Sequence, residues 1–202
     1  MKMKGLIAGL MVSAALTGVR ADGVATGDAA PDFTLKDVDG KDVSLAGFKG
    51  KYVVLEWVNH GCPFVKKHYG PGNMQGLQSE FGGKGVTWLS ICSSAEGNQG
   101  YEKPEDWKKL NADKKSAATD VLLDPDGTVG HAYNAKTTPH MFVIDPDGKV
   151  IYQGAIDSIK STESDDIKKA NNYVRAALDE ALAGKPVTRG TTEPYGCGVK
   201  YK

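Results

Sequence analysis

The sequence predicts an α/β fold in which one central mixed sheet carries helices on both faces. Two apolar runs, 51–58 and 86–92, have the nearly continuous hydrophobicity of strands that are covered on both sides. Helical patterns follow these runs, and a strand pair around the turn 145–148 precedes a final amphipathic helix. Strands and helices that alternate in this way along a chain build a single layered domain.

The first 21 residues have the pattern of a secretory signal peptide. Lys2 and Lys4 form a basic start, 6–16 is an apolar stretch, and 19–21 has the small residues of a cleavage site. The apolar stretch is too short for a membrane span, and no cysteine at the cut offers a lipid anchor. We therefore expect an exported protein, periplasmic or secreted, with no stable membrane anchor.

The remaining chain divides into a domain at 22–183 and a polar, glycine-bearing tail at 184–202. The whole sequence has 25 basic and 25 acidic residues. The only charged residues in the signal peptide are basic, so its removal would leave a small excess of acidic residues. A slightly negative net charge does not indicate binding to nucleic acid or to an anionic membrane. Three cysteines are too few for a disulfide-built scaffold, and their odd number in an exported protein predicts one pair and one remaining thiol.

The first half of the domain begins with a short hairpin at 31–45 around Asp39-Gly40. The run 51–58 is the predicted central strand. A helix is expected from Pro63, broken at 70–72 by Gly-Pro-Gly and resumed through Phe81.

The second half continues the alternation of strands and helices. Its predicted elements are a strand at 86–92, a short polar helix from near Pro104, a strand at 121–123, a strand pair at 140–144 and 149–153, and a helix from Ser164 to Gly184.

Several motifs occur in an order that resembles a known family. They are PDFTL, DGK, VSL and FKGKYVVLEW, then the Cys62-Pro63 turn, then TTPHMFVIDPDGKVIYQG. Together they resemble the thioredoxin fold, and more narrowly its exported thioredoxin-like and peroxiredoxin-like branch (the TlpA/ResA type and the alkyl hydroperoxide reductase/thiol-specific antioxidant group). The resemblance spans residues 28–183 and implies a thioredoxin-like (redoxin) domain.

Cys62 is the predicted nucleophile. It ends the central strand, and Pro63 suits the first position of a helix, so Cys62 falls at the helix N-cap. Unpaired backbone N–H groups and the positive end of the helix dipole favour a thiolate there. The resemblance places Cys62 at the first cysteine of Cys-x-x-Cys, the residue that attacks a disulfide. The alternative is a buried, inert cysteine that only caps the helix.

The sequence departs from the family at the second cysteine, because that position is Val65. Exchange between two cysteines of one helical turn is therefore excluded. Peroxiredoxins carry their peroxide-reducing cysteine at this second position, with a Thr or Ser three residues ahead and an arginine nearby. Beyond the signal peptide the chain has only Arg175 and Arg189, neither of them near a suitable strand end. A peroxidase stays open as an alternative, because an exposed thiolate still reacts with peroxide.

Glu56 lies six residues before Cys62, where thioredoxins carry a buried acid beneath the active site. Burial would raise the pKa of this carboxyl group and make it a proton acceptor near neutral pH. The alternative is an ordinary ion pair with a lysine at the strand edge.

Thr138-Pro139 matches the family's cis-proline. The resemblance implies that a cis bond keeps this backbone beside the cysteine, pairs residue 138 with a bound substrate chain and keeps metal from the thiolate. A trans proline at a strand start is the alternative. We expect Thr138, Pro139 and Pro63 to contact the substrate.

No metal and no cofactor are predicted. The histidines at 60, 68, 131 and 140 lack a ligand spacing such as His-x-x-x-His. Copper-carrying members of this fold use Cys-x-x-x-Cys, whereas position 66 is Lys66.

Two cysteines compete as the partner that resolves Cys62. Cys92 ends the strand 86–92, at the same sheet edge as Cys62, but neighbouring strands seldom give the Cβ directions that a disulfide needs. Cys197 lies in Tyr-Gly-Cys-Gly, where glycines allow a mobile tail to approach the helix start and withdraw on reduction. We favour Cys197. Alternatively, Cys197 belongs to a permanent structural disulfide that leaves Cys62 unbridged.

These features predict an exported thiol–disulfide oxidoreductase in which Cys62 attacks and Cys197 resolves. Its partners are a protein or small-molecule disulfide or thiol and an electron donor that the sequence does not name. Two other readings stay open: a peroxiredoxin-like thiol peroxidase with one cysteine, and a non-enzymatic protein that binds a peptide or copper beside Pro139.

Overall fold

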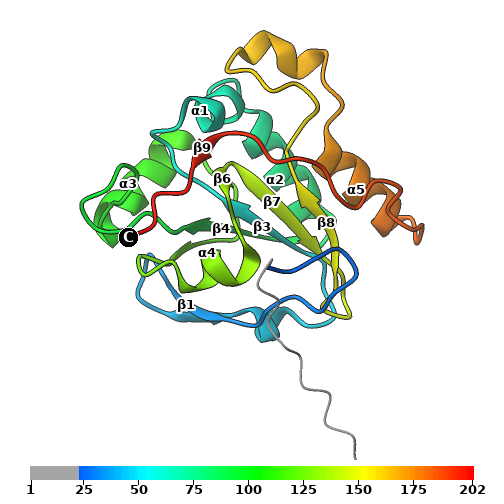
Figure 1. Ribbon diagram of the computed structural model, residues 1–202, viewed down its shortest axis with the longest axis horizontal. Helices are drawn as coiled ribbons and strands as arrows, with labels where there is room; N and C mark the ends of the chain where they lie inside the picture. The colour runs from blue at the N-terminus through cyan, green and yellow to red at the C-terminus, as the bar shows by residue number, and fades with distance from the viewer. Residues whose placement is uncertain (1–22) are drawn as a thin grey trace, which may run out of the picture.

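The computed structural model describes residues 23–202, so the signal peptide expected at 1–21 lies outside the described residues. The main sheet has seven strands in the order β2-β1-β5-β4-β3-β7-β8 (Figure 1). These strands are β1 (Thr34–Asp37), β2 (Asp42–Ser44), β3 (Val53–Trp57), β4 (Thr87–Cys92), β5 (Asp120–Leu123), β7 (His140–Ile144) and β8 (Val150–Gly154). A separate two-stranded ladder joins β6 (Thr137–Thr138) to β9 (Cys197–Gly198).

The sheet is mixed, as the sequence predicts. β3 and β5 both run parallel to β4, whereas β7 lies antiparallel to β3 and β8 antiparallel to β7. β1 pairs antiparallel with both β2 and β5. All five residues of β3 are buried, which explains why the run 51–58 has almost no polar interruption.

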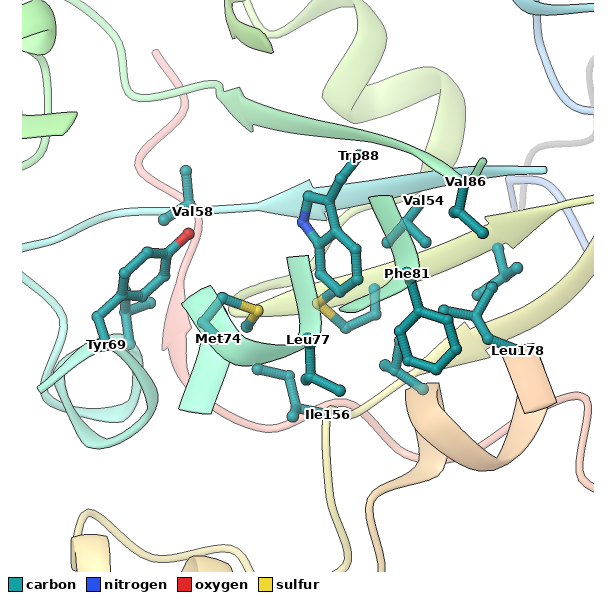
Figure 2. Packing of buried hydrophobic residues seen from close by; sticks show 14 of the residues in the cluster. Val54, Val58, Tyr69, Met74, Leu77, Phe81, Val86, Trp88, Ile156 and Leu178 are labelled. Atoms are coloured by element: carbon teal, nitrogen blue, oxygen red, sulfur yellow. The ribbon is translucent and has the colours of Figure 1, made fainter. Parts of the chain in front are cut away.

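Helices cover both faces of the sheet. They are α1 (Pro63–Tyr69), α2 (Asn73–Gly83), α3 (Pro104–Lys114), α4 (Thr128–Tyr133) and α5 (Tyr173–Leu182), with short 3-10 turns η1 (Leu45–Phe48) and η2 (Ser164–Lys168). On one face Trp88 of β4 packs with Phe81 of α2 and Leu178 of α5 (Figure 2). On the other face, Trp57 contacts Tyr133 of α4.

The predicted break in the first helix is confirmed. α1 ends at Tyr69 and α2 begins at Asn73. Gly72, which precedes α2, has φ of 83°, a left-handed conformation that glycine adopts without steric cost. The chain therefore changes direction between α1 and α2, and both helices pack against the same face of the sheet.

The last helix begins later than the sequence predicts. Ser164–Lys168 is a separate 3-10 turn, and α5 starts only at Tyr173. The side chain of Asn172 accepts a hydrogen bond from the backbone N–H of Arg175 at 2.9 Å, so Asn172 is the N-cap. The acidic run at 164–166 resembles a helix start but opens the 3-10 turn instead.

Residues 191–202, called here the C-terminal strap, are docked across the molecule rather than extended away from it (Figure 1). At one end of the strap, the backbone N–H of Thr192 donates a hydrogen bond to the backbone oxygen of Gln153 at 3.0 Å. At the other end Lys200 accepts a hydrogen bond from the backbone of Ala95 at 2.8 Å. Between these ends lies β9. Across residues 23–202, the structure shows no helix with the length and apolar character that crossing a membrane requires.

Candidate active site

Cys62 lies at the N-cap of α1, with Pro63 at the first helical position, as predicted. The residue is fully buried. Its thiol donates a hydrogen bond to the backbone oxygen of Thr138, with 3.1 Å between sulfur and oxygen. Cys62 therefore follows the end of β3 and lies at the start of α1, next to β6.

The strap brings Cys197 to the same point. In the β6–β9 ladder Cys197 is the direct partner of Thr138, whose carbonyl oxygen faces Cys62. The thiols of Cys62 and Cys197 are close enough that each shifts the pKa of the other, and neither is in a disulfide. Gly196 permits this approach, because its φ is 149° and a Cβ there would collide with the Thr138 carbonyl oxygen.

The two thiols differ in acidity. Burial opposes ionisation of Cys62, but hydrogen bonds from the Cys197 thiol and the Val65 backbone N–H outweigh it and lower the pKa of Cys62. Burial, and next the interaction with Cys62, raises the pKa of Cys197 to about 11. Of the pair, Cys62 is therefore the group that ionises first.

The other residues expected at the substrate side lie around this pair. The Thr138–Pro139 peptide bond is cis, which confirms that expectation. Thr138 and Pro139 are buried, and the Thr138 hydroxyl lies 3.5 Å from the backbone oxygen of Cys197. Pro63 is exposed next to the buried Cys62.

Cys92 does not join the pair. It ends β4, is buried, and donates its thiol hydrogen to the backbone oxygen of Gly100 at 3.3 Å. Burial raises the pKa of Cys92, so its thiol stays protonated. Sharing a sheet edge with the strand of Cys62 did not bring the two sulfurs together.

Glu56 is fully buried in β3, and its carboxylate accepts four hydrogen bonds from side chains. The donors are Trp88 at 2.8 Å, Tyr69 at 2.9 Å, Gln78 at 3.2 Å and Ser90 at 3.4 Å. Burial raises the pKa of Glu56 to about 7 despite these donors. The alternative of an ion pair with a lysine is wrong. Tyr69 extends the network toward the site, since its ring packs on His60, two residues before Cys62.

Glu56→Gln is expected to change how stability depends on pH. The folded pKa near 7 lies above the ordinary value of 4.5, so between these values folded protein holds a proton that unfolded protein releases. The contribution of Glu56 to stability should therefore fall as pH rises through this window, by about 3 kcal/mol in total. Glutamine resembles the protonated acid and removes this loss.

Urea unfolding of the reduced protein at about pH 5 and pH 8 measures the effect. The free energy of unfolding of Glu56→Gln should increase relative to that of wild type as pH rises. Glu163→Gln, at an exposed position, should keep the pH dependence of wild type. Parallel curves for wild type and Glu56→Gln would show that the carboxyl titrates near its ordinary value.

Three of the four histidines are buried, and both arginines within residues 23–202 contact other side chains. Burial lowers the pKa of His60 and His68 to about 4 and of His140 to about 3, so these rings are neutral at neutral pH. Within residues 23–202, no three His, Cys, Asp or Glu side chains are grouped so as to hold a metal ion. Arg175 is paired with Glu80 at 2.7 Å, and Arg189 lies over the ring of Tyr173.

A buried polar cluster beside the site was not foreseen. It joins Lys67 of α1, Asp157 of the segment after β8, and Tyr195 of the strap. The otherwise polar and glycine-bearing tail contains two tyrosines, Tyr195 and Tyr201, and they were the available signal, because a tyrosine marks a point where a tail can be anchored. The partners of Tyr195 are far away in sequence and carried no signal of their own.

The comparisons with known proteins agree with this geometry. The sequence profile described as the AhpC/TSA family matches residues 26–153. The chain is 30% identical over 132 residues to "Thiol-disulfide oxidoreductase ResA" of Bacillus subtilis (strain 168), covering 64% of this chain and 67% of that one.

Solved structures show the same fold. An uncharacterized conserved protein from Geobacillus kaustophilus has a TM-score of 0.76 at 30% identity, covering 88% of this chain and 93% of that one. The thioredoxin domain of a thiol-disulfide oxidoreductase from Bacteroides vulgatus has a TM-score of 0.52 at 28% identity, covering 73% and 98%.

A mixed sheet of this topology, with a thiol at the start of α1 and a cis-proline beside it, defines a thioredoxin-like redox enzyme. The profile matches well over half of the chain. The chain therefore belongs to the AhpC/TSA family.

Proposed function

We propose that the protein is an exported thiol–disulfide oxidoreductase in which Cys62 attacks the substrate and Cys197 resolves the intermediate. The observation that carries this proposal is that two free cysteines meet at Thr138, Cys62 through its hydrogen bond to the Thr138 oxygen and Cys197 through the β6–β9 pairing. The relative from Bacillus subtilis, named a thiol-disulfide oxidoreductase, supports the reaction class. The basic and apolar pattern of residues 1–21 supports export.

The first step uses the thiolate of Cys62. It attacks one sulfur of a protein or small-molecule disulfide, R–S–S–R′, forming a bond from Cys62 Sγ to the R sulfur. The R–S to S–R′ bond breaks, and R′–S⁻ leaves and takes up a proton. The lowered pKa of Cys62 increases the fraction of the protein that carries the attacking thiolate. Because the strap covers Cys62, it must shift to admit the substrate.

The second step uses Cys197. Its thiol loses a proton, attacks Cys62 Sγ, and forms the Cys62–Cys197 disulfide while R–S⁻ leaves. Burial is the first reason for the raised pKa of Cys197, and interaction with Cys62 is the second. Once Cys62 is bound in a mixed disulfide, it carries no negative charge. The second reason then disappears, so Cys197 ionises more readily when it is needed.

The surrounding residues take supporting roles in this proposal. Glu56 is the proton acceptor beneath the site, with a pKa near 7 and a connection through Tyr69 toward His60. Thr138 and Pro139 hold the backbone against which a substrate chain lies, and the exposed Pro63 contacts the substrate.

Mapping the cysteines of oxidised protein tests the proposal. After incubation with oxidised glutathione, alkylation of the remaining thiols and digestion, we expect one disulfide between Cys62 and Cys197. Cys92 should be alkylated only after unfolding, because it is buried. A disulfide that includes Cys92, or oxidised protein without a Cys62–Cys197 bond, would contradict the assignment of Cys197 as the resolving residue.

Reduction of hydrogen peroxide is expected to be slow, because residues 23–202 lack the Thr or Ser and the arginine that polarise peroxide at the peroxiredoxin positions. Val65 stands where peroxiredoxins carry their reactive cysteine. Arg175 and Arg189, the two arginines within residues 23–202, are held by Glu80 and by Tyr173. The rate of Cys62 oxidation should stay within about tenfold of that of a free thiolate. Stopped-flow oxidation measures it, and a rate thousands of times higher would favour a peroxidase.

A further inference from the structure

The cluster of Lys67, Asp157 and Tyr195 contains charges that the proposed reaction does not use. Lys67 is 1% exposed and Asp157 is 3% exposed. The Lys67 ammonium lies 3.2 Å from a carboxylate oxygen of Asp157 and donates to the backbone oxygen of Ile159 at 2.8 Å. Burying two charges is costly, and packed apolar residues often serve stability equally well. The location of the cluster therefore calls for an explanation beyond stability.

Tyr195 connects this buried pair to the strap. Its hydroxyl donates to the second carboxylate oxygen of Asp157 and lies 3.3 Å from the Lys67 nitrogen. Burial, together with the hydrogen bond to Asp157, raises the pKa of Tyr195, so the hydroxyl keeps its proton. The Tyr195 ring packs edge-on against Phe64, with centroids 5.7 Å apart.

The cluster joins the two segments that carry the thiols. Lys67 and Phe64 belong to α1, which begins immediately after Cys62. Tyr195 lies two residues before Cys197, and only Gly196 stands between them. A hydrogen bond at Tyr195 thus fixes where the strap meets α1 and, through Gly196, where Cys197 meets Cys62.

We propose that Tyr195 is a positioning residue for Cys197, held by Asp157 and Lys67, and that its hydroxyl raises the effective concentration of the Cys197 thiol at Cys62. This inference rests on the proposed function. In this proposal the buried pair of Lys67 and Asp157 holds the strap at Tyr195, so that Cys197 lies next to Cys62. The second step of the reaction is then intramolecular and rapid.

The test compares Tyr195→Phe with wild type in a glutathione redox buffer. The equilibrium between the Cys62–Cys197 disulfide and the dithiol gives the effective concentration of Cys197. Phenylalanine keeps the ring that packs on Phe64 and removes only the hydroxyl. Loss of a hydrogen bond to a charged acceptor should lower the effective concentration about tenfold.

Tyr52→Phe is the matched control, because the Tyr52 hydroxyl donates to the backbone oxygen of Ala181, outside the strap. In Tyr52→Phe, the effective concentration of the Cys197 thiol should equal that in wild type. A second readout is the rate at which a bulky maleimide modifies Cys62 in reduced protein. That rate should rise about tenfold in Tyr195→Phe as the strap opens more often, and stay unchanged in Tyr52→Phe.

The outcomes separate this inference from the function on which it rests. If wild type forms no Cys62–Cys197 disulfide, the proposed function is wrong and the inference falls with it. If wild type forms it and Tyr195→Phe keeps the same effective concentration and maleimide rate, the inference alone is wrong. Reduced stability in urea without either change would show that the hydroxyl is merely structural.

Discussion

Replacing Cys62 with serine is expected to lower disulfide reduction by at least about a thousandfold, the scale seen when an enzyme loses its nucleophile. A serine hydroxyl does not ionise near neutral pH, so neither the attack nor the disulfide with Cys197 is available. Reduction of insulin with a dithiol as electron donor, followed by turbidity, measures the loss. Cys62 is the thiol of lowered pKa at the start of α1, which is why the expected effect is so large.

Cys92→Ser is the matched control for this experiment. Cys92 is a second buried thiol, but its pKa is raised and its partner is the backbone of Gly100. The variant should retain activity within about twofold of wild type, as is usual for a conservative change away from a reaction centre. Loss of activity in Cys92→Ser together with retained activity in Cys62→Ser would reverse the assignment.

Replacing Cys197 is expected to stop the reaction after its first step. Without an intramolecular thiol, the mixed disulfide on Cys62 waits for an external thiol, and turnover should fall roughly a hundredfold. Mass spectrometry should show one substrate group bound per chain, attached to Cys62. Full activity of Cys197→Ser with no accumulated mixed disulfide would mean that Cys197 does not resolve Cys62.

Serine and alanine at position 197 separate two roles of this residue. The Cys197 thiol donates a hydrogen bond that helps to lower the pKa of Cys62. Serine keeps a donor, whereas alanine removes it, so the pKa of Cys62 should be higher in Cys197→Ala than in Cys197→Ser. The rate of alkylation by iodoacetamide as a function of pH reports this difference, and both variants lack the resolving sulfur.

The sequence predicted the central elements of the fold well because burial leaves a local pattern. The runs 51–58 and 86–92 contain β3 and β4, and the Gly-Pro-Gly at 70–72 separates α1 from α2. α4 was not predicted, because six residues give too little helical periodicity to recognise. The two-residue ladder of β6 and β9 is too short for any alternation.

The site was predictable where local chemistry or the family motif marked it. Cys62 before Pro63 indicates a helix N-cap, and the Thr138–Pro139 bond is cis as the motif implied. Cys197 and Cys62 both lie at Thr138, but the resolving role of Cys197 stays a prediction, and the strap is docked rather than free (Figure 1). The Lys67–Asp157–Tyr195 cluster joins residues 38 to 128 positions apart, and no local pattern reports such a meeting.

The ladder between β6 and β9 makes the strap an internal competitor for any partner chain. A chain that pairs with the backbone of Thr137 and Thr138 needs the positions that Gly198 and Cys197 occupy. Its apparent affinity is reduced by the fraction of molecules in which the strap is closed. The proposed Cys62–Cys197 disulfide would close the strap covalently, so an oxidised molecule would exclude such a chain altogether. In the proposed reaction, release of product and protection from rebinding would then follow from the same bond that ends the reaction.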